Sequence, residues 1–197
     1  MKTFYDAKRT TSATIDLADW VEPEQLFDDA LRASCEVFLA TDHLAGLFGG
    51  DHKDMTDVDK AIDIARRKGD RIYYIEIYSH GDFFVRIEKS YEPMSRFDSG
   101  LNGVLIVHAE AWKRLVNPVF TQGCVDREMR RLSERATAWL NGEIFEIFSD
   151  GVASGPFFSE EEAETVLRAE YPLLRFQDDD FICERSYRLK PELRAAA

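Results

Sequence analysis

His80, Asp98 and Ser99 are the residue types of a hydrolytic triad, in which histidine takes the serine proton and a carboxylate orients the histidine. The Gly-x-Ser-x-Gly elbow that often presents such a serine is absent. His80 also lies in a turn-like segment, 79–82, and Ser99 is followed by Gly100, which is typical of turns. We therefore assign no catalytic residue. His80, Asp98 and Ser99 remain the candidates for an alternative function as a small hydrolase or nuclease.

Asp51 and His52 belong to an Asp- and His-rich segment, residues 42–57. Imidazole and carboxylate groups can bind a divalent metal. The spacing matches neither a helical His-x-x-x-His pair nor a calcium loop, since Lys53 interrupts the acidic pattern. We expect a solvated loop without metal. Asp51 and His52 are kept as the candidate ligands and as a second set of groups for the hydrolase alternative.

Four glycines, Gly81, Gly100, Gly103 and Gly142, lie between apolar segments and are predicted to be structural corners, because glycine accepts backbone conformations that other residues avoid. Neither Gly-x-Gly-x-x-Gly nor a lysine-containing phosphate loop occurs. We expect no cofactor.

The elements that would position these residues follow from the apolar spacing. Alternation predicts strands at 71–78 and 82–88, paired antiparallel through the turn at 79–82. Further strands are predicted at 103–107, 143–148 and 181–187. Helices are predicted from Pro23 to Leu39, from Thr56 to Gly69, from Ala109 to Leu115, from Val125 to Trp139, and from the capping box at Ser159 to just before Pro172.

Helices fall before and between these strands without strict βαβ alternation. This order favours an α+β fold with a mainly antiparallel sheet and flanking amphipathic helices. A length of 197 residues suits one domain over residues 1–197, and no internal linker is visible. The first 20 residues or so carry few periodic signals and are expected to be extended. The stripe that ends at Trp139 predicts that this side chain is mostly buried.

The charge balance is 25 basic against 37 acidic residues, a formal net charge of -12. Such a chain repels nucleic-acid phosphates and anionic lipids, so direct nucleic-acid or membrane binding is not expected. A basic host or effector protein is the expected partner. The acids assigned to that contact are Glu160, Glu161, Asp178, Asp179 and Asp180.

The three cysteines are far apart and form no Cys-x-x-Cys pair. This odd number favours a reducing compartment over a disulfide framework. The start of the chain, Met1 to Arg9, lacks an apolar run, and no stretch is long and apolar enough to span a bilayer. We expect a cytoplasmic protein.

Three blocks in this order resemble a family of small uncharacterised accessory proteins of bacterial plasmids, integrative elements and phages. They are Tyr78-Ser79-His80-Gly81, Arg96 to Gly103 with Asp-Ser-Gly at its centre, and Trp139 to Phe145 with Leu-Asn-Gly-Glu. The likeness covers roughly residues 45–165 and includes a Gly50-Asp51-His52 patch. Phe97 stands where many relatives have Trp, and the loop after Gly151 lacks a Trp-Gly-Phe-like run. The resemblance implies a mobile-element setting but no activity.

These observations favour a non-enzymatic mobile-element accessory protein that acts by protein–protein contact. Its acidity fits an anti-restriction or anti-CRISPR factor that engages a basic effector. The alternatives are the hydrolase or nuclease above and a structural component of a phage or conjugation apparatus.

Overall fold

The computed structural model describes residues 1–6, 12–18, 27–40, 48, 52–94 and 99–176. Its contacts group into two compact units. The terminal unit comprises Met1–Asp19 and Ile144–Ala197, and the central unit comprises Trp20–Glu143. The predicted α+β class with antiparallel-rich sheets is confirmed. The chain that was expected to form one domain over residues 1–197 thus builds two sheets, one in each unit.

The terminal unit is a five-stranded antiparallel sheet, in the order β10-β1-β2-β8-β9, with one helix. Its elements are β1 (Lys2–Tyr5), β2 (Ser12–Leu17), β8 (Phe145–Ser149), β9 (Val152–Phe157), α6 (Glu160–Glu170) and β10 (Arg175–Phe176). Helix α6 begins at the predicted cap, where the Glu162 N–H donates to Ser159 Oγ over 3.1 Å. Its Ala163 and Leu167 pack on Phe4, Ile15 and Ile147. The opening residues, expected to be extended, include the two paired strands β1 and β2. The strand predicted at 181–187 lies outside the described residues.

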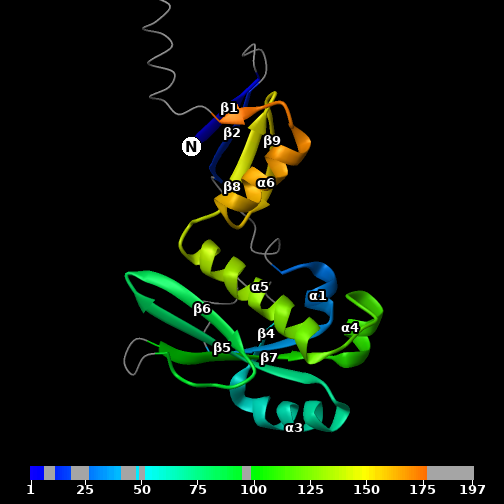
Figure 1. Ribbon diagram of the computed structural model, residues 1–197. Helices are drawn as coiled ribbons and strands as arrows, with labels where there is room; N and C mark the ends of the chain where they lie inside the picture. The colour runs from blue at the N-terminus through cyan, green and yellow to red at the C-terminus, as the bar shows by residue number, and fades with distance from the viewer. Residues whose placement is uncertain (7–11, 19–26, 41–47, 49–51, 95–98, 177–197) are drawn as a thin grey trace, which may run out of the picture. The chain divides into compact units, whose positions relative to one another are not determined.

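The central unit contains a second sheet, in the order β4-β3-β7-β5-β6, whose pairs are antiparallel except for β3 with β4 (Figure 1). Its strands are β3 (Cys35–Leu39), β4 (His52–Asp54), β5 (Arg71–His80), β6 (Asp82–Glu88) and β7 (Ser99–Val107). Its helices are α1 (Asp29–Ala33), η3 (Met55–Asp57), α3 (Val58–Lys68), α4 (Ala109–Leu115) and α5 (Gln122–Leu140). The hairpin predicted at 71–88 is therefore confirmed.

Helices α3 and α5 cover opposite faces of this sheet (Figure 1). Even-numbered residues such as Phe38, Val104 and Ile106 pack against Ile62 and Ala65 of α3. On the other face the Tyr73 hydroxyl donates to Asp126 Oδ1 of α5 over 2.7 Å. Successive side chains of a strand point to opposite faces, so odd- and even-numbered residues of a regular stretch meet different helices. The register shift between β5 and β7 changes this parity, and odd-numbered Leu101 lines a pocket with Ile62 of α3.

The edge strand β6 is closed by polar side chains of α5. Amides of Phe83, Val85 and Ile87 donate to Asn141 Oδ1, Thr137 Oγ1 and Ser133 Oγ, over 2.8, 3.0 and 2.9 Å. Every second amide of β6 therefore meets a side chain from every fourth residue of α5. The apolar stripe of the same helix holds Val125, Met129, Leu132 and Ala136 buried as predicted, but Trp139 is half-buried and Ala138 is buried in its place.

The helix predicted from Pro23 to Leu39 is wrong in its second half. Helix α1 ends at Ala33, and the residues after Ser34 form β3 between β4 and β7. Val37, Phe38 and Leu39 are all buried, since this strand is covered on both faces. A short apolar run of this kind has no distinctive period, so spacing alone cannot tell a doubly covered strand from a helix.

Two of the four predicted corner glycines are turn residues, Gly81 at φ 97° between β5 and β6 and Gly142 at φ 69° after α5. The other two are not corners, because Gly100 and Gly103 lie inside β7. A side chain at Gly103 would place its Cβ 2.5 Å from the Phe38 carbonyl oxygen, so glycine is needed there for close packing. Nothing lies within 4 Å of a Cβ built at Gly100.

Candidate functional site

His108 follows directly after β7, and the strand register brings two carboxylates to its face of the sheet. Residue Val107 pairs with Cys35 of β3 on one side and with Arg71 of β5 on the other. His108 is one residue beyond Val107, and on the two neighbouring strands Ser34 and Asp70 are one residue before Cys35 and Arg71. The His108 N–H donates to the Ser34 carbonyl over 2.9 Å. Asp70, Glu36 and His108 are all even-numbered, so their side chains share the face covered by α3.

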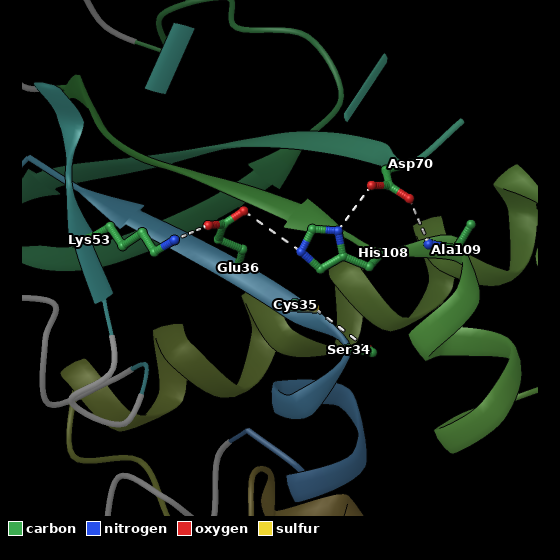
Figure 2. A network of polar contacts seen from close by, with 7 residues as sticks. All are labelled: Ser34, Cys35, Glu36, Lys53, Asp70, His108 and Ala109. Carbon is green, nitrogen blue, oxygen red and sulfur yellow. Dashed lines mark hydrogen bonds and ion pairs between the residues drawn. The ribbon is translucent and has the colours of Figure 1, made fainter. Parts of the chain in front are cut away.

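Asp70 fixes the His108 ring. Its Oδ2 lies 3.0 Å from His108 Nδ1, and its Oδ1 accepts the Ala109 N–H over 2.9 Å at the start of α4 (Figure 2). The Asp70 side chain is only 6% exposed. An ionised carboxylate only accepts hydrogen bonds, so this contact favours the tautomer with the proton on Nδ1, in which Nε2 is the acceptor nitrogen of the ring.

The other ring nitrogen faces a second carboxylate. His108 Nε2 lies 3.7 Å from Glu36 Oε2, and the other Glu36 oxygen pairs with Lys53 Nζ (Figure 2). The distance of 3.7 Å is too long for a hydrogen bond but is within ion-pair range for a protonated ring. Glu36 would attract the imidazolium that forms once Nε2 has taken a proton.

These side chains open on a pocket between α3 and the sheet, which we call the α3 pocket. Its volume is about 280 Å³. The lining residues are Glu36, Phe38, Lys53, Asp57, Lys60, Ala61, Ile64, Ala65, Lys68, Asp70 and His108. The His108 side chain is 36% exposed, so a molecule in the pocket can reach it. An oriented imidazole with a free acceptor nitrogen is the arrangement of a general base.

The nucleophile-type side chains next to this pocket are not available for attack. Burial raises the pKa of the Cys35 thiol to about 12, so it carries almost no thiolate near neutral pH. The Ser34 hydroxyl is buried and donates to the Leu31 carbonyl over 2.7 Å. Proton transfer at His108 would therefore act on water or on the bound molecule itself.

Two of the triad candidates, His80 and Ser99, lie near the opposite end of β5 and β7. Ser99 pairs with Tyr78, and the His80 ring stacks on the Tyr78 ring at 6.4 Å, so His80 and Ser99 border the same tyrosine. The Ser99 hydroxyl forms a hydrogen bond to the buried Glu76 carboxylate. The Ser99 hydroxyl therefore donates its hydrogen bond to a carboxylate, whereas a triad serine donates to its histidine. Asp98 lies outside the described residues.

Of the two metal candidates only His52 lies within the described residues. His52 lies in β4 opposite Val37, and Asp51 lies outside the described residues. Within the described ranges no group of three or more His, Cys, Asp or Glu side chains is placed to hold a metal ion.

The acids assigned to partner binding are only partly described. Glu160 pairs with Lys2 over 2.9 Å, whereas Glu161 is exposed in the first turn of α6. Asp178, Asp179 and Asp180 lie outside the described residues. No helix in the described part of the chain is long and apolar enough to cross a membrane.

Sequence reasoning missed His108, Asp70 and Glu36, although the first two carry a usable signal. His108 ends the most apolar strand of the chain, and Asp70 follows the glycine that stops α3. The register of β3, β7 and β5 brings the three residues together, and this register cannot be predicted from spacing along the chain. Comparison of the chain with protein-family models, curated proteins and solved structures finds no match. The resemblance to mobile-element accessory proteins therefore stays a prediction.

Proposed function

We propose that the central unit binds a small molecule in the α3 pocket and exchanges a proton with it through Nε2 of His108. The observation that carries this proposal is the contact of the nearly buried Asp70 carboxylate with His108 Nδ1. It selects the tautomer whose free nitrogen faces the pocket. Proton transfer by a positioned histidine typically contributes a factor of about 10²–10⁴ to a rate.

The contacts around His108 support this role because both carboxylates that face the ring are themselves held in place by other groups. Asp70 accepts from the first amide of α4 as well as from the ring, so its carboxylate is fixed by backbone. Glu36 is held by Lys53, which itself lies over the Phe38 ring at 5.9 Å. The imidazole thus reacts from a preset orientation, which is the condition under which acid–base groups work well.

The test is the tautomer of His108, read from the ring ¹⁵N shifts of the full chain at a pH where the imidazole is neutral. We expect the proton on Nδ1. In Asp70→Asn the amide replaces the second carboxylate oxygen, and the population should move toward a proton on Nε2. His80, at the far end of β5, is the internal control and should not change. A parent ring protonated on Nε2 would contradict the proposal, because Nε2 would then have no lone pair to offer.

A second candidate function is the mobile-element accessory role, acting by contact with a basic protein. The net charge of -12 favours it, since opposite charge speeds association and the effect weakens with salt. In this proposal Glu161, with Asp178, Asp179 and Asp180, forms the contact, whereas Glu160 is partly neutralised by Lys2.

Two variants separate this second candidate from catalysis in an anti-restriction or anti-CRISPR assay. One replaces Glu161, Asp178, Asp179 and Asp180 by their amides and leaves Glu162 in its capping position. The other is His108→Asn. Loss of inhibition only in the first variant supports the contact role. Loss of inhibition only in His108→Asn contradicts the contact role and supports the acid–base site.

A further inference from the structure

The α3 pocket has one wall that proton transfer at His108 does not explain. Lys60, Ile64 and Lys68 follow each other at four-residue steps along α3, and all three line the pocket. Residues four apart share one side of a helix. At a rise of 1.5 Å per residue, the backbone positions of the two lysines lie roughly 12 Å apart.

The lysines around the pocket differ in their partners. Lys53 pairs with Glu36, and the Asp70 carboxylate contacts the His108 ring. Within the described residues neither Lys60 nor Lys68 has a carboxylate at ion-pair distance. Asp57 is the one other acid among the lining residues of this pocket. The lining residues include three lysines and three carboxylates, so the pocket carries no net charge with His108 neutral, but Lys60 and Lys68 place the lysine charge that lacks an ion pair on its α3 wall.

The part of the pocket between the lysines is apolar. Ile64 is 38% exposed, and Phe38, Ala61 and Ala65 lie with it among the lining residues. Apolar surface of this kind gains roughly 25 cal/mol for each Å² that a ligand covers. A volume of about 280 Å³ is just below the range of roughly 300–1,000 Å³ for small-molecule sites, which suits a small ligand.

We propose that the molecule held in the α3 pocket is a small organic anion, a carboxylate or phosphate carrying an apolar group, bound by Lys60 and Lys68. This inference rests on the proposed proton exchange at His108 for its biological meaning but not for its test. The anionic group meets a lysine ammonium, the apolar group covers Ile64, and the bound molecule lies within reach of His108 Nε2.

The probes are benzoate and phenyl phosphate, with benzyl alcohol and benzylamine as neutral and cationic controls of similar size. Backbone ¹H–¹⁵N spectra of the full chain report binding. We expect both anions to shift the amides of 60–68 and 108–109, and the two controls to leave them in place. Raising the salt concentration should weaken anion binding, because these lysines are exposed.

The variant Lys60→Gln with Lys68→Gln should raise the Kd of the better anion by about tenfold, a change of about 1.4 kcal/mol. The matched control is Lys113→Gln, which removes one lysine of α4 that pairs with Glu110 and does not line the pocket. It should bind the anion like the parent. Since Lys60 and Lys68 are exposed, both variants should fold, which the same spectra verify.

The results distinguish this inference from the proposed function. Equal binding of benzyl alcohol and benzoate, no binding of either anion, or an unchanged Kd in the double variant overturns the anion assignment, even where the His108 tautomer is as expected. Anion binding that depends on Lys60 and Lys68 supports it, even where His108 proves to be protonated on Nε2 and the proton-exchange role falls.

Discussion

Asp70 serves two partners with one carboxylate, the His108 ring and the first amide of α4. We expect Asp70→Ala to lower the free energy of unfolding by about 1–3 kcal/mol, since a buried donor is left without an acceptor. Asp70→Asn should cost less, because its amide oxygen can still accept from Ala109. Urea unfolding of the three proteins measures the order. Equal stability of Asp70→Ala and the parent would mean that the corner between β7 and α4 does not depend on this side chain.

Glu76 is a second buried carboxylate among the described residues of the central unit, with a side chain only 2% exposed. Desolvation alone would raise its pKa, but the Met94 N–H at 2.7 Å, the Ser99 hydroxyl and the Arg86 guanidinium together hold the pKa below its ordinary value of 4.5. A carboxyl with a lowered folded-state pKa adds stability above its ordinary pKa, and this contribution is lost as the pH falls through the folded-state value.

We therefore expect the parent to lose stability below pH 4.5 more steeply than Glu76→Gln, which has no such proton to take up. At neutral pH the variant should be the less stable of the two, since Arg86 keeps its charge without its partner. Glu88→Gln, exposed on the same hairpin, is the control and should follow the parent. Urea unfolding over a pH series is the measurement, and parallel curves for parent and Glu76→Gln would refute the prediction.

At the scale of elements, α5 and β6 are joined by the three polar side chains Ser133, Thr137 and Asn141. An edge strand with free amides is a site for pairing with other chains. Replacing the three by alanine should cost roughly 0.5–1.5 kcal/mol for each lost hydrogen bond. It should also speed hydrogen exchange at the amides of Phe83, Val85 and Ile87, and promote self-association at high concentration.

Glu134→Ala on the exposed side of α5 is the matched control, because it leaves the polar stripe in place. Exchange mass spectrometry and sedimentation measure the two effects. If the β6 amides exchange as slowly in the triple variant as in the parent, packing of α5 alone protects the strand. The three polar side chains would then contribute nothing to that protection.

At the scale of the whole molecule, each unit has a buried cluster of its own. Leu167 belongs to the cluster of the terminal unit, and Leu105 is fully buried in the sheet of the central unit. Truncating either to alanine should destabilise its own unit by about 2–5 kcal/mol. Exchange protection should fall in the unit that carries the change and stay at parent values in the other. Equal loss of protection in both units after either change would show that they unfold as one.

The sequence by itself determined the local features of this protein. Spacing and caps placed the hairpin at 71–88, the helix around Val125–Ala136 and the cap at Ser159, because these depend on residues close along the chain. Composition determined the charge of -12. Predictions that depended on residues far apart in the sequence were less accurate. The residues of β3 were predicted to be helical, and Gly100 was predicted to be a corner but lies in β7.

Only the tertiary structure decided which polar residues meet. Asp70 lies 38 residues and Glu36 lies 72 residues before His108 in the sequence. In the fold the three side chains share one face of neighbouring strands. Ser99, which the sequence offered only as a candidate for an alternative hydrolase function, has its hydroxyl bound to Glu76. The physical reason is register: strand pairing turns separation along the chain into proximity, and side-chain alternation then selects one face. Neither is present in the spacing of residues before the sheet forms.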